Sequence, residues 1–236
     1  MTPLQASILR LQRSRQLLAE GTVDERRAMG VLRDHYEGTF VSGPFFTAGL
    51  PDLLTLCMHE HPSGFTWGNT ASSAVCRLPS DGEPTMWWAA GTPCTGVYVP
   101  VWVAAGGVPD IMGKAGIRPG TVNPELAEPD RFDRTSYWWR FLQLLESVKG
   151  GELALRFAER QPIVRAAFDA LEERWLDEAP GVLTTAQRRV AEGPDMLAAY
   201  TQACCDEAVD TVERLLGDFA EPLDMIVDPR WAPATR

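Results

Sequence analysis

The stretch LLTLCMHEHPSGFTWGNTASSAVCRLPSDGEPTMWWAAGTPCTGVYVPVWV, residues 53–103, decides the fold that we expect for this chain. It contains short apolar runs, and each break between them carries Gly, Pro, Asn or Ser. Runs of this length between turn residues predict consecutive strands of one antiparallel sheet. The predicted strands are Leu53–Met58, Thr70–Leu78, Thr85–Ala90 and Val97–Val103.

Two of these runs are apolar at consecutive positions, namely residues 86–90 and 97–103. A strand with one face in water alternates apolar and polar residues, so both faces of this sheet are expected to be covered. Helices of the C-terminal half can cover one face. A partner chain or a second copy of this chain would cover the other, because an open surface of this kind exceeds the apolar patch of an ordinary monomer. The alternative is that the helices of one chain wrap both sides.

Helical patterns flank the sheet, so the predicted fold is α+β, in a single domain of residues 1–236. N-terminal helices are expected within residues 1–35, at Thr2–Glu20 and Val23–Asp34, the second beginning with a capping box at Thr22–Glu25. Residues 104–133, rich in Gly and Pro, are expected to be irregular. C-terminal helices are expected within residues 134–220, and the tail contains a short predicted strand, LDMIV. The predicted C-terminal helices run from Tyr137 to a break at Lys149–Gly151, over residues 153–175 with a start or kink at Pro162, over Thr185–Glu192 and over Pro194–Asp218.

The composition excludes several classes of function. The net charge of −10 argues against nucleic acid or an anionic membrane as a partner, because both require clustered Lys and Arg. No apolar run is long enough for a membrane helix, and the N-terminus lacks the apolar core of a signal peptide. The five cysteines are odd in number and irregularly spaced, which favours reduced thiols and a cytoplasmic location.

Cys57 and His59 are the first candidates for chemistry, because residues two apart on a strand face the same way. They could form a nucleophile and base; alternatively, Cys57 is a small buried apolar residue and His59 a hydrogen-bonded residue at the end of a strand. His59-Glu60-His61 lacks a third ligand nearby, and Cys76 and Cys94 are far apart in sequence, so we predict no metal and no other cofactor.

Other polar segments allow a functional or a structural interpretation. Asn69–Ser72 could hold an oxyanion or a substrate carboxylate, or could be turn chemistry after Gly68. Thr92–Thr95 could form the wall of a cleft or a hairpin turn. Arg33–His35 is expected to be ion-paired structure rather than a substrate site, and Cys204-Cys205 is expected to pack inside a helix.

The order of several short motifs resembles the secernins and related dipeptidase-type cysteine peptidases, over roughly residues 8–175. The motifs are Leu32-Arg33-Asp34-His35, Leu56-Cys57-Met58-His59, Thr70-Ala71-Ser72, Gly91-Thr92-Pro93-Cys94 and Ser136–Phe141. The resemblance implies half of the four-layer αββα fold of N-terminal-nucleophile hydrolases. It also implies amide hydrolysis by an N-terminal cysteine whose own α-amine acts as the base. No cysteine precedes Cys57 here, so the nucleophile is expected on a partner chain.

The sequence therefore predicts one component of a secernin-like cysteine amidohydrolase or peptidase, acting with a partner chain on small peptides or amides. The alternatives are a non-catalytic binding or scaffold protein of the same fold, as a homodimer, and a self-sufficient enzyme with a new site. Candidate catalytic residues are Cys57, His59 and Asn69, and candidate substrate-binding residues are Thr70, Ser72, Thr92 and Cys94.

Overall fold

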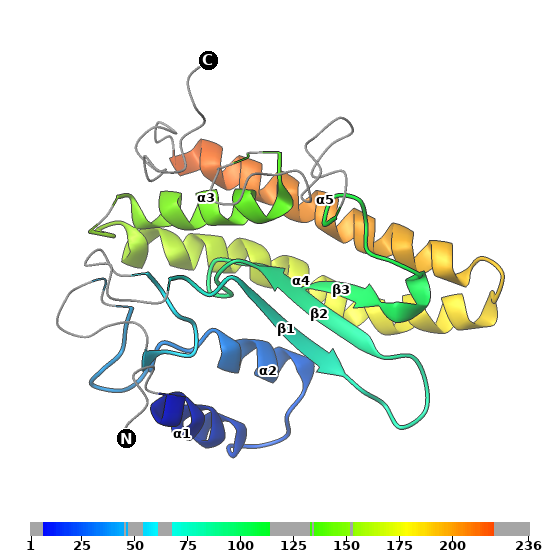
Figure 1. Cartoon of the computed structure of the whole chain (residues 1–236), viewed down its shortest axis with the longest axis horizontal. Coiled ribbons are helices and arrows are strands. Elements are labelled where there is room, and N and C mark those ends of the chain that lie inside the picture. Colours follow the sequence, from blue (N-terminus) through cyan, green and yellow to red (C-terminus); the bar gives the residue numbers. More distant parts are fainter. Residues whose placement is uncertain are drawn as a thin grey trace.

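A three-stranded antiparallel sheet packs against helices in this protein, so the predicted α+β class is confirmed (Figure 1). The computed structural model describes residues 7–44, 46, 54–60, 68–113, 133, 135–151 and 153–219. The strands are β1 (Ser72–Arg77), β2 (Thr85–Ala90) and β3 (Val99–Trp102), in the order β1-β2-β3. The α-helices are α1 (Ser7–Leu18), α2 (Glu25–Leu32), α3 (Tyr137–Lys149), α4 (Phe157–Arg188) and α5 (Gly193–Phe219), with a short 3-10 helix η2 (Val103–Ala105) after β3.

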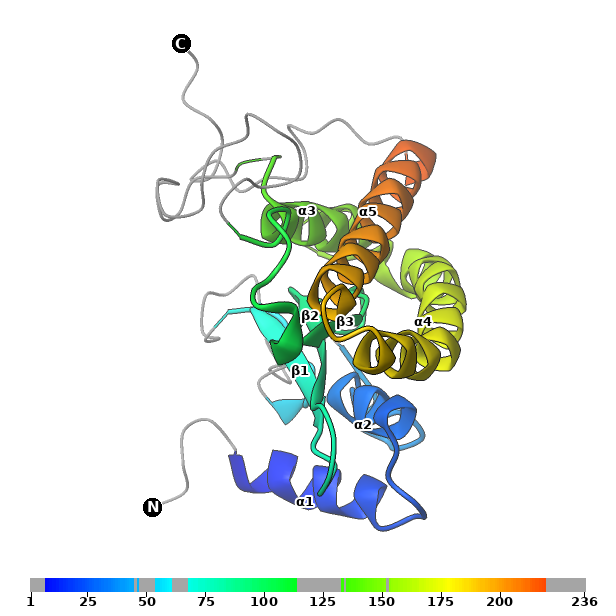
Figure 2. The same cartoon turned by 90° about the vertical axis from the view of Figure 1, so that its right-hand side faces the viewer.

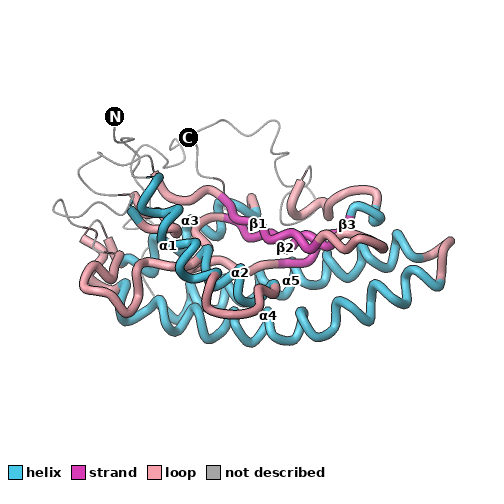
Figure 3. The backbone as a smooth tube through the Cα atoms, turned by 90° about the horizontal axis from the view of Figure 1, so that it is seen from below, coloured by secondary structure: helices cyan, strands magenta, loops and turns pink. Residues whose placement is uncertain are grey.

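Helices from the N-terminal and C-terminal parts of the chain pack against opposite edges of the sheet. α2 packs against β1 at one edge, and α4 and α5 pack against β3 near the other (Figures 1 and 2). Seen from below, α4 and α5 run along one side of the strands (Figure 3). The core lies between β3 and these helices, where Phe168, Val212 and Leu215 are fully buried.

The two faces of the sheet differ in how well they are covered. One face carries Thr85, Trp87 and Trp102, all buried; Trp102 Nε1 donates to Thr85 Oγ1 at 3.0 Å. The other face carries Ala74 opposite Trp88. Trp88 is half-buried and stacks on Tyr137 of α3, whereas Ala74 is exposed. The chain's own residues thus cover the first face and, over β3, also the second, where Val99 and Val101 are buried. Among the described residues the second face is open along β1.

The first predicted strand, Leu53–Met58, is wrong. Residues 54–60 form an irregular segment whose backbone bonds go to other loops: the Cys57 N–H donates to the Asp34 carbonyl at 3.3 Å, and the Thr70 N–H donates to the Met58 carbonyl at 2.9 Å. Residue 53 lies outside the described residues. Because no strand of the described residues pairs with this segment, the alternation that placed Cys57 and His59 on one strand face does not apply.

Two details of the helix prediction also need correction. The predicted helix at Thr185–Glu192 is not separate, because α4 continues without a break from Phe157 to Arg188 and includes Pro162 and Pro180. α2 begins after Asp24, whose side chain accepts from the Arg27 N–H, so the capping box predicted at Thr22 is replaced by an Asp cap. The predicted tail strand at residues 223–227 lies outside the described residues.

Candidate metal centre

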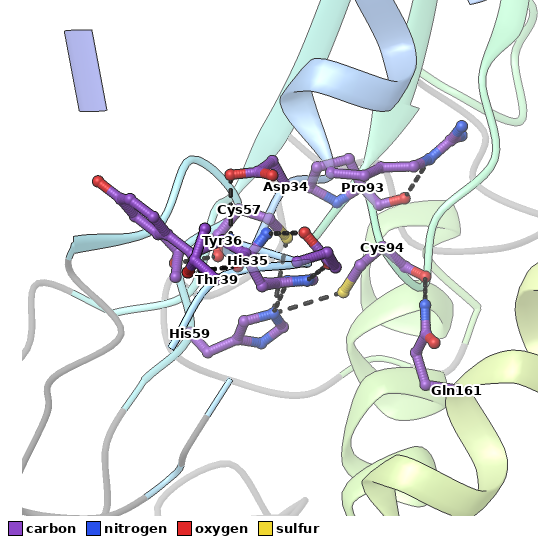
Figure 4. Close-up of polar contacts among 12 residues, drawn as sticks. Asp34, His35, Tyr36, Thr39, Cys57, His59, Pro93, Cys94 and Gln161 are labelled. Carbon is purple, nitrogen blue, oxygen red and sulfur yellow. Dashed lines mark hydrogen bonds and ion pairs between the residues drawn. The ribbon is translucent and has the colours of Figure 1, made fainter. Parts of the chain in front are cut away.

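Four side chains from distant parts of the chain converge at one buried point: His35, Cys57, His59 and Cys94 (Figure 4). Each offers one ligand atom, and these atoms all lie within 4.8 Å of one another. The four residues are at most 4% exposed. Two thiols and two imidazoles are the donor set of a zinc site.

His35 follows the C-terminal end of α2, and ion pairs fix the turn that carries it. Arg13 of α1 donates to both carboxylate oxygens of Asp34, at 2.9 and 2.6 Å, and both side chains are buried. Glu37 accepts from the His35 N–H at 2.7 Å and lies 3.0 Å from His35 Nδ1. The expectation that Arg33–His35 is ion-paired structure is confirmed for Asp34, but His35 itself points into the cluster.

Cys57 and His59 lie on the irregular segment 54–60, which the loops around it hold in place. The Thr70 hydroxyl accepts from the Met58 N–H at 2.9 Å, and the Asn69 side-chain oxygen accepts from the Glu60 N–H at 2.8 Å. The His59 ring packs against aromatic residues, with ring centroids 5.3 Å from Phe46 and 5.6 Å from Phe157. This apolar shell keeps water away from the cluster.

Cys94 lies in the loop between β2 and β3, and side chains of α2 and α4 bind the backbone of that loop. Gln161 donates to the Cys94 carbonyl at 3.1 Å, and Arg33 donates to the Pro93 carbonyl at 2.9 Å. Glu172 accepts from the Tyr98 N–H at 2.8 Å and forms ion pairs with Arg33 and Arg165. The position of the Cys94 sulfur is therefore set by two helices rather than by the loop alone.

The three distances from His59 Nε2 to the other donor atoms are close to the edges of a tetrahedron around one zinc ion. Zn–N bonds of about 2.05 Å and Zn–S bonds of about 2.3 Å give N–N edges of about 3.3 Å and N–S edges of about 3.6 Å. The two Nε2 atoms are 3.1 Å apart, and His59 Nε2 lies 3.5 Å from Cys57 Sγ and 3.4 Å from Cys94 Sγ. A two-iron Rieske cluster binds its Cys and His pairs to different irons. Here one nitrogen lies close to both sulfurs, so the donors surround a single point.

Hydrogen bonding alone does not satisfy these atoms. Glu37 can only accept, so His35 Nδ1 carries a proton; once the ring loses its second proton, Nε2 carries a lone pair directed at His59. His59 Nε2 has three neighbours within 3.5 Å and can make only one hydrogen bond of good geometry. His59 Nδ1 is buried and has no partner among the described residues. A cation at the centre accepts all four lone pairs at once.

The electrostatics of the cluster without a metal ion already favour positive charge at its centre. Burial opposes charge on His35, but its hydrogen bonds with Cys94 and Glu37 outweigh this and raise its pKa to about 10. Burial, together with the neighbouring Cys94, raises the pKa of Cys57 well above its usual value. Burial also disfavours the Cys94 thiolate, yet its bond with Cys57 and the charges of His59 and His35 lower its pKa well below the usual value. The two thiols thus share one negative charge, and a divalent cation would allow both to ionise.

The residues expected to be catalytic or substrate-binding divide into two groups. Cys57, His59 and Cys94 belong to the buried cluster, where they contact one another and not solvent. The prediction of no metal rested on sequence spacing, and spacing could not reveal this cluster because its residues come from three separate segments. His61 lies outside the described residues.

The second group lies beside the cluster. Asn69, Thr70 and Thr92 line a pocket together with residues of α3, whereas Ser72 begins β1, is exposed and does not line this pocket. The ligand that sequence reasoning missed is His35. Its signal was present in the motif Leu32–His35, which was assigned to ion pairing. Cys204 and Cys205 are buried within α5, as expected.

Neither a family model, nor a curated protein, nor a solved structure matches this chain. The resemblance to the secernins therefore stays a prediction. Among the described residues, no helix combines the length and the apolar character needed to cross a bilayer.

Proposed function

We propose that this protein binds one zinc ion through His35, Cys57, His59 and Cys94, and that the ion fixes the loops at one end of the sheet. The observation that carries the proposal is the convergence of these four buried donor atoms, all within 4.8 Å of one another. Two sulfur and two nitrogen donors favour zinc over magnesium or calcium, which prefer oxygen ligands.

The site has the character of a structural rather than a catalytic centre. A catalytic zinc ion keeps one coordination position for water or substrate, whereas four protein ligands close the sphere. Cys57 and His59 are 0% exposed, and the neighbouring pocket is lined by none of the four ligands. In this proposal Cys57 is a zinc ligand and not a nucleophile.

The second shell supports the same conclusion. Metal-binding histidines usually donate their other ring N–H to a carboxylate, which fixes the ring and its tautomer. Glu37 is placed for this role, 3.0 Å from His35 Nδ1. The ligands come from the end of α2, the segment 54–60 and the β2–β3 loop, none of which is held by regular hydrogen bonding. Zinc would replace the missing backbone bonds by joining the three segments.

Metal analysis of the purified chain tests this proposal. We expect one zinc per chain after purification in zinc-supplemented medium. Cobalt(II) in its place should give thiolate charge-transfer bands and the intense visible bands of tetrahedral coordination. Cys57→Ser and Cys94→Ser should lose the metal. Matched controls are Cys76→Ser, an exposed thiol, and Cys204→Ser, a buried thiol in α5, and both should retain it. A wild-type chain that binds no zinc, or a Cys94→Ser variant with unchanged zinc affinity, overturns the proposal.

A second candidate function is a component of a secernin-like amidohydrolase that acts on small peptides or amides with a partner chain. The layer order supports it, because helices cover one face of an antiparallel sheet and the other face is open along β1 among the described residues. A closed zinc centre at Cys57 is compatible with it, because the nucleophile would then lie on the partner. The non-catalytic alternative places a second copy of this chain on the same face.

Native mass spectrometry and a tagged-chain capture from the source organism separate these candidates. The hydrolase proposal predicts a partner with an N-terminal cysteine, hydrolysis of small peptides by the complex, and loss of both when Ala74 on the open face is changed to Glu. Phe40→Glu is the control, because Phe40 is 97% exposed and lies on a loop away from the sheet. A homodimer without peptidase activity supports the scaffold alternative instead. A monomer that captures nothing contradicts both.

A further inference from the structure

A pocket of about 350 Å³ lies beside the proposed zinc centre, and no role has yet been assigned to it. One wall comes from the segments next to the zinc ligands, through Glu60, Asn69 and Thr92. The other wall is the face of α3 that carries Trp138 and Trp139. The volume falls at the lower end of the range for small-molecule sites, about 300–1,000 Å³.

Glu60 is the charged residue that lines this pocket. Its backbone N–H is bound by the Asn69 side-chain oxygen at 2.8 Å, which fixes the residue at the pocket wall. Its carboxylate forms no ion pair or hydrogen bond with any residue that the structure describes, and the side chain is half-buried. A partly buried carboxylate without a partner is costly, so it favours a cationic ligand.

The surroundings of Glu60 add negative rather than positive charge. Glu146 of α3 lies close enough that the charge of Glu60 contributes to its raised pKa, for which burial is the main cause. Lys149 donates to both carboxylate oxygens of Glu146, at 2.9 Å each, so its charge neutralises Glu146 rather than Glu60. Together, Glu60, Glu146 and Lys149 contribute a net charge of about −1.

The α3 wall supplies aromatic surface in a fixed orientation. Trp138 and Trp139 pack edge to face with their ring centroids 4.9 Å apart. Trp138 Nε1 donates to the Ala71 carbonyl at 2.6 Å, which ties the indole to the start of β1. Leu142 and Leu145 continue the same wall. Indole rings attract cations and also provide apolar contact area.

We propose that this pocket binds a small molecule that joins an ammonium group to an apolar or aromatic body. The ammonium group pairs with the Glu60 carboxylate, and the body packs on Trp138 and Trp139. The Asn69 amide nitrogen, which has no partner among the described residues, is available to a ligand carbonyl. A free amino acid amide or the N-terminus of a short peptide has this combination of groups.

Isothermal titration of the zinc-loaded chain with three matched probes tests the inference. Phenethylamine carries the ammonium group, 2-phenylethanol is its neutral counterpart, and 3-phenylpropionate is an anion of similar size. We expect the amine to bind about tenfold more tightly than the alcohol, and the anion to bind more weakly than both. Glu60→Gln should remove the preference for the amine, and Trp138→Ala should weaken amine and alcohol alike.

The control for the charge change is Glu173→Gln, because Glu173 is a surface acid of α4 that does not line the pocket. It should leave all three affinities unchanged. Equal affinities for amine and alcohol, or an amine affinity that Glu60→Gln leaves unchanged, overturn the inference. The zinc content of each sample is measured in parallel, so failure of amine binding in a chain that holds one zinc refutes the pocket alone and leaves the metal centre standing.

Discussion

Removal of the metal ion should loosen one end of this protein and leave the long helices in place. The proposed ion joins three segments, at residues 33–37, 54–60 and 92–96, whose backbone bonds are few and irregular. Val212 and Leu215 of α5 are fully buried, and neither is among the proposed ligands. We therefore expect a partly folded metal-free state rather than complete unfolding.

The size of the effect follows from mass action. Free zinc at about a thousand times its dissociation constant stabilises the folded state by about 4 kcal/mol. For a chain of this size, each kcal/mol shifts the melting temperature by about 2–4 °C. Chelation should therefore lower the melting temperature by about 8–16 °C. In the metal-free cluster His59 Nε2 has three buried neighbours and one hydrogen-bonding position, which adds to the loss.

Calorimetry and hydrogen exchange with and without a zinc chelator measure this prediction. Amides of the three ligand-bearing segments should lose protection, whereas those of α5 should keep it, and added zinc should restore the first state. The Cys76→Ser variant should behave like the wild type, because this exposed thiol lies on β1 away from the cluster. An unchanged melting temperature and unchanged exchange after zinc has been removed would refute a structural role for the ion.

Three further changes have outcomes that the structure specifies. Glu37→Gln removes the carboxylate beside His35 Nδ1, and a competition assay with a colorimetric chelator should show zinc affinity reduced about 10–100-fold. Glu172→Ala leaves two arginines without their buried partner and should lower the free energy of unfolding in urea by about 3–5 kcal/mol. Gly193→Ala places a Cβ against the main-chain oxygen of Ala186 at the α4–α5 turn. Denaturant titration should show a loss of about 1–3 kcal/mol, and an unchanged midpoint would contradict the packing of that turn.

Much of the fold could be predicted from local patterns. β2 was predicted at its observed bounds, Thr85–Ala90, because it is a short apolar run with turn residues on both sides. α3 begins at Tyr137 as predicted, after a Ser136 cap that binds the Trp139 N–H. Leu53–Met58 was wrongly predicted to be a strand. A short apolar run indicates that side chains are buried, but it does not indicate which segment the backbone hydrogen bonds to. Of its described residues, Thr55 and Cys57 are buried, and Cys57 belongs to the cluster rather than to a sheet.

The candidate site could be predicted only in part, because its ligands are close in space and distant in sequence. Cys57 and His59 were singled out as a neighbouring pair, and Cys94 was assigned to the same site on different grounds. His35 was assigned to an ion-paired turn, and that assignment was correct for Asp34 beside it. Spacing rules for zinc detect pairs of ligands within one segment. They fail here because only Cys57 and His59 form such a pair. The other two residues, His35 and Cys94, are 59 positions apart in the sequence.

The motifs that carry the resemblance to the secernins acquire a common physical meaning in this structure. Leu32–His35 supplies one ligand, Leu56–His59 supplies two and Gly91–Cys94 supplies the fourth, while Thr70 and Ala71 line the adjacent pocket. Three short motifs chosen without reference to geometry would not be expected to meet at one buried point. The convergence supports the proposed metal centre, and the pocket lies beside it. On this view a chain with the same motifs but a Cys94→Ser change should lose zinc and pocket together, whereas a change at Glu60 should alter ligand preference and leave zinc in place.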